Sequence, residues 1–293
     1  MSLPVSRRSF LSLATSGLAV GALGLAPGAE AAKRKAAAVA APGMAAAAGP
    51  VYLNLNECPL GPTPAALDAA QAILPRAGRY LFELQNDLIA LFAGEQQLPS
   101  DHVAVYPGSS DPLNRAARAF TSARAGVVVA DPTFEAVADI DLIGQRQDLL
   151  VLRTFSKLYG MAGLRLGLAV ASPGLLTNLA AFGENPAAIT AVAAGIASLR
   201  EVQLVPARRA DNARIRNETI AWLQSKGYKC LPSQANCFMV DVKRDGKAFA
   251  AAMARQGVMI GRSWPIWPKL VRVTVGSEAE MLRFREAVLK ARK

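Results

Sequence analysis

The chain has 293 residues, and 52% of them are hydrophobic, so it can bury a sizeable core in one domain or in a large and a small one. Its formal net charge is +11, but beyond the first fifty residues the charge is spread out without basic runs, which argues against a nucleic-acid-binding protein. One histidine, His102, and three cysteines without repeated spacing argue against a histidine-rich metal site and a disulfide framework.

The first fifty residues are not expected to belong to the fold. Residues 1–31 combine paired arginines, an apolar stretch rich in Gly and Ala, and small residues where a peptidase could cut. This pattern resembles a twin-arginine export signal, and it places the expected residues at Ser6, Arg7, Arg8 and Phe10. The alternative is an ordinary basic N-terminus on a hydrophobic anchor. Residues 32–50 are of low complexity and are predicted to be a tether, so we expect export to the bacterial periplasm after folding.

Strand-like and helix-like segments alternate from residue 51 onward. The run "HVAVYPGSS" ends at Gly108, Ser109 and Ser110, and "DPLNRAARAFTS" then reads as a helix. A strand, a turn of small residues and a helix N-terminus together present backbone N–H groups to an anion. The segment "GVVVADPTFEAV" repeats this pattern, and the apolar run "DLLVLRTF" follows it.

The C-terminal part continues the alternation. Helical patterns such as "PARRADNARIRNETIAWLQSKG" lead into the strand-like "ANCFMVDV", the helical "GKAFAAAMARQG" and the strands "VMIGR" and "KLVRVTVG". Ser277 and Glu280 form a predicted capping box at the start of the final helix. Strands separated by helices predict an α/β architecture.

The stretch "TFSKLYGMAGLRLG" carries the clearest chemical signal. It places Lys157 at the end of an apolar run and Arg165 eight positions later, with glycines between and around them. A lysine followed by small residues and a second cation suits a site that holds a phosphorylated aldehyde. The structural alternative is that Lys157 is a surface lysine.

With these residues the chain resembles the class I and II aminotransferases of pyridoxal-phosphate fold type I, and within them it is most similar to histidinol-phosphate aminotransferases and their exported relatives. The resemblance runs from about residue 51 to the end and is carried by "YLNLNECPLGPTPAAL", "GRYLFELQNDLIALFA", "PGSSDPLNRA", "DPTFEA", "RTFSKLYGMAGLRLG" and "VRVTVG". It implies a shortened large domain with a mostly parallel sheet over residues 51–180 and a small α/β domain over residues 181–293. In the first segment Cys58 stands where the family usually has asparagine.

The resemblance also implies roles for individual residues. Lys157 would bind the cofactor aldehyde covalently and then move a proton. The phosphate would be held by Ser109, Ser110, Ser156 and Arg165, with Tyr80 reaching the neighbouring subunit's phosphate in a homodimer. Phe134 would stack on the pyridine ring or, alternatively, pack in the core.

The substrate end of the implied site lies in the C-terminal part. Arg272 would bind the substrate carboxylate, although a structural ion pair is the alternative. Asn236 and Arg262 lie where the family places groups near the cofactor or the distal end of the substrate. No metal site is expected.

The sequence departs from the family after "DPTFEAVA". The family continues there for on the order of eighty residues before the lysine strand, whereas here "DIDLIGQRQDLLVLRTFSK" follows almost at once. The missing part carries the asparagine of an N-P-T-G turn and the aspartate and tyrosine of a D-E-A-Y strand. That aspartate keeps the pyridine nitrogen protonated, and Asp139 and Asp141 are the nearest carboxylates in sequence. Loss of interior strands would also expose apolar surface and strand edges.

The resemblance therefore predicts a pyridoxal-phosphate-dependent aminotransferase that moves an amino group between an amino acid or amino alcohol phosphate and a 2-oxo acid. Two alternatives stay open, namely a catalytically inactive remnant that still binds the cofactor and a non-enzymatic periplasmic binding protein. A decarboxylase of the same fold would share the lysine and phosphate motifs. We expect no nucleic-acid partner and no stable membrane anchor after signal removal.

Overall fold

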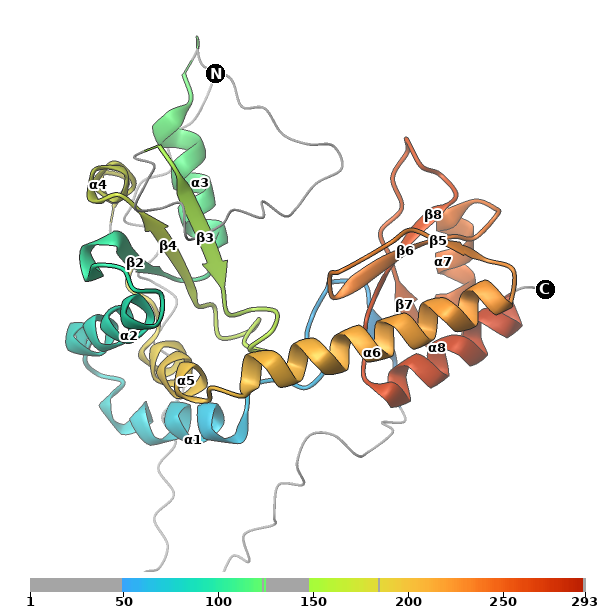
Figure 1. Cartoon of the computed structure of the whole chain (residues 1–293), viewed down its shortest axis with the longest axis horizontal. Coiled ribbons are helices and arrows are strands. Elements are labelled where there is room, and N and C mark those ends of the chain that lie inside the picture. The colour runs from blue at the N-terminus through green and yellow to red at the C-terminus, as the bar shows by residue number, and fades with distance from the viewer. Residues whose placement is uncertain (1–48, 123, 125–147, 184, 292–293) are drawn as a thin grey trace, which may run out of the picture. The chain divides into compact units, whose positions relative to one another are not determined.

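The computed structural model describes residues 49–122, 124, 148–183 and 185–291 (Figure 1). The predicted export signal, most of the predicted tether, and Phe134, Asp139 and Asp141 lie outside the described residues. Within the described ranges, no helix combines the length and apolar character needed to cross a membrane.

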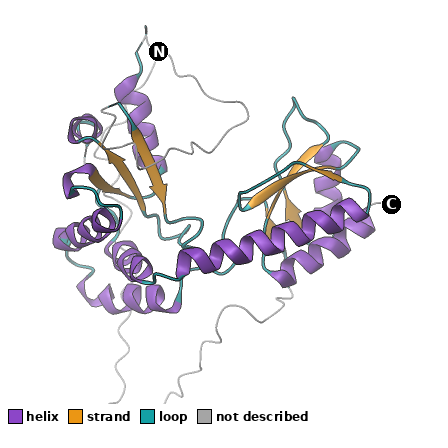
Figure 2. Cartoon of the chain, viewed as in Figure 1, coloured by secondary structure: helices purple, strands orange, loops and turns teal. Residues whose placement is uncertain are grey.

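Helices and strands are interspersed along the described chain (Figure 2). The strands are β1 Val51–Leu53, β2 Val103–Tyr106, β3 Leu150–Thr154, β4 Gly167–Ala171, β5 Lys229–Cys230, β6 Cys237–Asp241, β7 Val258–Ile260 and β8 Leu270–Thr274. The α-helices are α1 Pro64–Ile73, α2 Phe82–Glu95, α3 Ser110–Phe120, α4 Pro173–Ala180, α5 Ile189–Arg200, α6 Leu204–Ser225, α7 Gly246–Ala254 and α8 Glu278–Ala291. Two short 3-10 helices, Leu74–Arg76 and Ser100–His102, complete the set. The predicted α/β class is confirmed.

The sheet nearest Lys157 has the strand order β2-β4-β3. Both pairs in it are antiparallel, because β4 returns from β3 as a hairpin and lies between β2 and β3, which run in the same direction. Among the described strands, the only parallel pair is β1 with β7. The hydrogen-bonding pattern in this part of the chain therefore differs from the mostly parallel sheet that the resemblance implies.

Helices cover both faces of this sheet. Leu168 and Val170 on β4 belong to the buried cluster formed with α1, α2 and α5, whereas Ala169 and Ala171 belong to the cluster formed with α3 and α4. Successive residues of a strand point to opposite faces, so one short strand separates two apolar layers. All five residues of β4 are buried, which fits a strand with neighbours on both edges and both faces.

The C-terminal elements form a second core around the antiparallel order β5-β6-β8. Its largest fully buried side chains include Phe238, Phe249 and Phe284. The N-terminal strand β1 also contributes to this core, since Val51 and Leu53 are buried in it. Helix α8 begins with the predicted capping box, in which the Ser277 N–H donates to Glu280 Oε2 at 2.7 Å and the Glu280 N–H donates to Ser277 Oγ at 3.3 Å.

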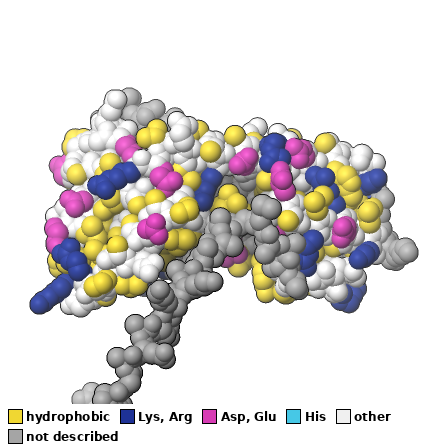
Figure 3. All heavy atoms as spheres, turned by 90° about the horizontal axis from the view of Figure 1, so that it is seen from below, with side chains coloured by type: hydrophobic (Ala, Val, Ile, Leu, Met, Phe, Trp, Pro, Cys, Tyr) yellow, Lys and Arg dark blue, Asp and Glu magenta, His cyan; other side chains and the backbone are white. Residues whose placement is uncertain are grey.

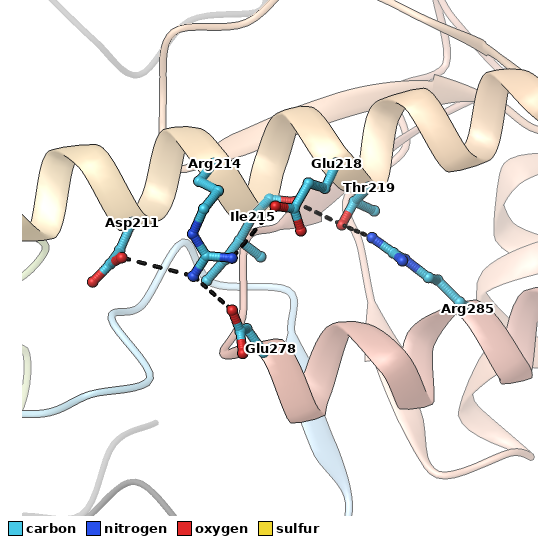
Figure 4. Close-up of polar contacts among 7 residues, drawn as sticks. All are labelled: Asp211, Arg214, Ile215, Glu218, Thr219, Glu278 and Arg285. Atoms are coloured by element: carbon cyan, nitrogen blue, oxygen red, sulfur yellow. Dashed lines mark hydrogen bonds and ion pairs between the residues drawn. The ribbon is translucent and has the colours of Figure 1, made fainter.

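Polar contacts join helix α6 and α8 at their surface (Figure 4). Arg214 forms ion pairs at 3.7 Å with Asp211, at 3.4 Å with Glu218 and at 2.6 Å with Glu278 of α8. Further along the same two helices, Arg285 Nη2 of α8 donates to Thr219 Oγ1 of α6 at 3.3 Å (Figure 4). These contacts fix the side of α6 that faces the C-terminal helix.

Candidate functional site

The loop that joins β3 to β4 carries Lys157. Its shape is set by backbone hydrogen bonds, with the Phe155 N–H donating to Leu166 O at 3.1 Å and the Met161 N–H donating to Phe155 O at 3.0 Å. Phe155, Met161 and Leu166 are buried in the core and anchor the loop, while Lys157 stays half-buried at its surface. Buried residues at both ends and in the middle of the loop thus hold Lys157 near its surface.

The predicted phosphate-binding residues come together from two connections of the sheet. Arg165 Nη1 donates to Ser156 Oγ at 3.2 Å and to Ala162 O at 2.9 Å. A Cβ on Gly108 would collide with the Arg165 guanidinium, so that side chain lies directly against the turn that begins α3. Arg165 itself has φ 61°, a left-handed conformation that costs a non-glycine residue roughly 1–3 kcal/mol.

The same turn brings Ser109 and Ser110 to this place. Ser109 is the N-cap of α3, and no side chain caps the helix there. Helix N-termini offer unpaired N–H groups and a positive dipole end, and Arg165 adds a full positive charge beside them. Hydroxyl groups, amides and a guanidinium in this arrangement fit a phosphate dianion.

A segment that we call the strap, residues 54–61, lies over Lys157. Three predicted site residues each donate to one of three consecutive strap carbonyls. Lys157 Nζ donates to Leu55 O at 3.0 Å, Arg272 Nη2 to Asn54 O at 2.8 Å and Asn236 Nδ2 to Asn56 O at 2.7 Å. The strap therefore connects the lysine loop with β8, the strand that carries Arg272.

The strap is also fixed to the end of β8. The Asn56 N–H donates to Thr274 Oγ1 at 2.9 Å, and Thr274 Oγ1 lies 3.2 Å from Asn56 Oδ1. Asn56 has φ 55°, and asparagine tolerates this left-handed conformation better than most residues. These contacts keep the strap carbonyls beside the end of β8.

A pocket of about 280 Å³ opens between the strap, the lysine loop and the end of β8. Its lining residues are Tyr52, Glu57, Cys58, Pro59, Ser156, Gly160, Ala162, Gly163, Thr274, Val275, Gly276 and Glu280. Ser156 thus faces both this pocket and the Arg165 guanidinium. The pocket is large enough for a small polar ligand.

Neither of the two carboxylates that line this pocket, Glu57 and Glu280, is assigned to a pyridine nitrogen. Glu280 Oε2 already accepts hydrogen bonds from Ser277, and Glu57 belongs to the strap. The residues present therefore fit the phosphate and aldehyde ends of the expected cofactor, whereas no described residue is assigned to its ring nitrogen. Over the described ranges, no group of three or more acidic, histidine or cysteine side chains could hold a metal ion.

The remaining predicted residues lie elsewhere. Arg262 is exposed in the connection after β7, next to Arg272, whose N–H donates to Arg262 O at 3.0 Å. Tyr80 precedes α2, is 69% exposed and stacks on Phe82 with ring centroids 5.7 Å apart. Among the predicted site residues that the structure describes, only Ser156 lines the pocket. The role of Tyr80 in the site of a second subunit stays a prediction. Phe134 lies outside the described residues.

Tyr159 packs against Phe155, one of the buried residues that anchor the lysine loop, and their ring centroids are 4.6 Å apart. Burial is the main cause that raises the pKa of Tyr159 above its usual value, and the negative charge of Glu95 adds to it. Tyr159 is therefore a neutral phenol at physiological pH, and it does not act as a base there.

Two features of this site have no recognisable signal in the sequence. The strap carbonyls carry no side-chain signature, so no motif could reveal them. Arg208 on α6 donates to the Leu158 carbonyl at 2.7 Å and to the Gly61 carbonyl at 2.8 Å. It stands in a helix with many charged residues, and its sequence context does not distinguish it from the others.

Comparison with known proteins gives a consistent result. The family model for class I and II aminotransferases matches residues 133–288. A histidinol-phosphate aminotransferase of Symbiobacterium thermophilum is 27% identical in an alignment of 326 positions, which spans 82% of this chain and 90% of that protein. An aromatic amino acid aminotransferase of Rhodococcus jostii is 39% identical over 149 residues, but the match covers only 39% of its length.

Solved structures agree at the level of the fold. The histidinol-phosphate aminotransferase from Clostridium acetobutylicum has a TM-score of 0.71 at 14% identity, covering 81% of this chain and 98% of that one. The enzyme from Sinorhizobium meliloti in complex with pyridoxal-5'-phosphate has a TM-score of 0.69 at 19% identity, covering 82% of this chain and 90% of that one. The predicted fold type I architecture is confirmed by these similarities.

Proposed function

The chain belongs to the class I and II aminotransferase family, whose cofactor is pyridoxal phosphate, and from this premise we propose that it transfers an amino group from an amino acid or amino alcohol phosphate to a 2-oxo acid. The histidinol-phosphate aminotransferases among the similar proteins support a phosphorylated donor of that kind. The observation that carries the proposal is that Arg165 contacts both Ser156, the neighbour of Lys157, and the Gly108 turn.

Each residue of the proposed site has a distinct task. The Lys157 amine would bind the aldehyde carbon of the cofactor and, once displaced, carry the proton that leaves the substrate's Cα. Arg165, Ser156, Ser109 and Ser110 would hold the phosphate so that the cofactor stays bound through both half-reactions. When bound, pyridoxal phosphate supplies the electron sink for the carbanion at Cα.

The substrate would be oriented from the C-terminal side. Arg272 is half-buried on β8 and donates to the strap at Asn54, so its guanidinium is held in place before a carboxylate arrives. A preorganised guanidinium can bind a carboxylate through two parallel hydrogen bonds. Asn236 and the exposed Arg262 would complete the substrate end.

A second candidate is a remnant that binds the cofactor but transaminates poorly. Alignment with the Symbiobacterium enzyme runs over 326 positions, which is longer than the 293 residues of this chain, so the relative has positions that this chain lacks. This supports a shortened central part, in which the aspartate partner of the pyridine nitrogen would be missing. Without that partner, the ring would be a weaker electron sink and turnover would fall.

We also propose a homodimer and periplasmic export. Exposed apolar side chains gather on α1 and on the chain that leads into α2, as Figure 3 shows from that side, and they include Leu67, Leu74, Tyr80 and Phe82. An exposed apolar patch of this kind suits contact with a second subunit, which Tyr80 would reach. The twin-arginine pattern at Arg7 and Arg8 supports export, and secretion of a reporter fused to residues 1–31 would test it.

Borohydride trapping tests the proposed function. The purified mature protein would be incubated with pyridoxal phosphate, reduced and mapped by peptide mass spectrometry, and amino transfer from histidinol phosphate would then be assayed. We expect one pyridoxyl adduct at Lys157, lost in Lys157→Ala and kept in the control Lys247→Ala, whose lysine is exposed on α7.

Each outcome decides between the candidates. An adduct at Lys157 with measurable transfer supports the aminotransferase. The same adduct without transfer supports the cofactor-binding remnant. Adducts scattered over surface lysines, or none at all, would contradict both.

A further inference from the structure

Arg208 connects two segments that lie far from it in the sequence. It belongs to the second turn of α6 and is half-buried, with Nη1 donating to Leu158 O at 2.7 Å and Nη2 donating to Gly61 O at 2.8 Å. Nη1 also lies 3.8 Å from Cys58 Sγ. The Arg208 guanidinium therefore contacts Leu158, the residue next to Lys157. It also contacts Cys58 and Gly61, the first and last residues of the turn at the end of the strap.

The lysine loop and the strap touch at a point where no side chain fits. Gly160 has φ 70°, and a Cβ placed on it would overlap the carbonyl group of Gly61. That carbonyl is the one that accepts from Arg208 Nη2. The contact between loop and strap thus has a close backbone approach on one side and the Arg208 guanidinium on the other.

The position of the Lys157 amine depends on this contact. Lys157 Nζ donates to Leu55 O of the strap, while its neighbour Leu158 is held by Arg208. If Arg208 is removed, the Leu158 and Gly61 carbonyls lose a charged donor, and the loop and strap can move apart. Misplacement of a reacting group by about 1 Å can slow its reaction by as much as ~100-fold.

We propose that Arg208 is a positioning residue, which sets the Lys157 amine by tying the lysine loop to the strap. The effect of Arg208 on reactivity rests on the proposed function, because it concerns the reaction of the Lys157 amine with the cofactor aldehyde. The tie itself is a property of the apoprotein and can be measured without any cofactor. A guanidinium is required because a lysine ammonium lacks the planar geometry that reaches both carbonyls at once.

The test compares Arg208→Ala and Arg208→Lys with Arg209→Ala, which removes an exposed arginine from the neighbouring position of α6. In the apoprotein, hydrogen exchange of peptides covering residues 156–163 should be faster in Arg208→Ala than in Arg209→Ala. With pyridoxal phosphate, the rate of borohydride-trapped adduct formation at Lys157 should fall roughly tenfold in Arg208→Ala and less in Arg208→Lys. Added guanidinium ion at low concentration should restore part of the rate in Arg208→Ala alone.

The outcomes separate this proposal from the proposed function. Equal loop exchange in the Arg208 and Arg209 variants would overturn the tie, whatever the cofactor does. Faster exchange with an unchanged trapping rate would overturn the positioning role. If the wild-type protein forms no adduct, the proposed function fails, and exchange then decides on the tie alone. Should Arg208→Ala fail to fold, Arg208→Lys carries both measurements.

Discussion

The lysine loop and the C-terminal core are held together by different kinds of contact. In the loop and strap, polar donors meet backbone carbonyls and two glycines allow close approaches at Gly108 and Gly160. In the C-terminal core, the rings of Phe238 and Phe284 pack edge to face, with centroids 6.5 Å apart. Phe284 belongs to α8, the helix that begins with the capping box. The first region is specified by the position of polar atoms, and the second by the volume of its side chains.

This difference predicts how each region responds to mutation. A core specified by volume tolerates changes that keep volume and suffers from deletions. A region specified by backbone contacts suffers when even one methyl group is added. Two substitutions test that contrast, a third compares both regions with an exposed cluster of charges, and the three run from the largest expected effect to the smallest.

Phe284→Ala should give the largest loss of stability. The Phe284 side chain is fully buried in the C-terminal core, so its removal leaves a cavity that the surrounding residues cannot fill. We expect the free energy of unfolding to fall by about 3–5 kcal/mol, measured by urea denaturation. Leu282→Ala on the exposed side of the same helix is the matched control and should change it by less than about 1 kcal/mol. Similar losses for the two variants would show that α8 is not anchored by this core.

Gly160→Ala should destabilise the lysine loop although it adds only one methyl group. The new Cβ would overlap the Gly61 carbonyl, and the positive φ of Gly160 is unfavourable for alanine. We expect a loss of about 2–3 kcal/mol in the free energy of unfolding. Gly163→Ala, in the same loop with no neighbouring atom near its Cβ, should stay within about 0.5 kcal/mol of wild type. Equal behaviour of the two variants would mean that the loop and strap do not need their close contact.

Much of this architecture could be predicted from the sequence where the signal is local. The capping box of Ser277 and Glu280 forms as predicted, because it needs only residues three positions apart. Ser156 and Arg165 meet because they lie near the two ends of the loop that joins the antiparallel strands β3 and β4. Local spacing is enough for such features, since the intervening chain leaves few alternatives.

Features that depend on distant partners could not be predicted in this way. The obstacle to a side chain at Gly160 is Gly61, and the acceptor for Lys157 is the backbone of Leu55, so neither residue carries an identifying side chain. The antiparallel pairing of β4 with β2 depends on strand order, which the sequence pattern does not contain. The predicted domain boundary at residues 180 and 181, and the roles of all the predicted site residues, stay predictions.

The ion pairs of Arg214 should contribute least, although Figure 4 shows three carboxylates around its one guanidinium. All of its partners are largely exposed, and exposed pairs gain little because water and salt screen them. The carboxylate of Glu278, which accepts a hydrogen bond from Arg214, raises the pKa of that guanidinium, which is ionised at any physiological pH in either case. We expect Arg214→Gln to lower the melting temperature slightly in dilute buffer and not at all in 1 M salt. A large decrease that persists in high salt would show that α6 is held to α8 by these charges rather than by the apolar core beneath them.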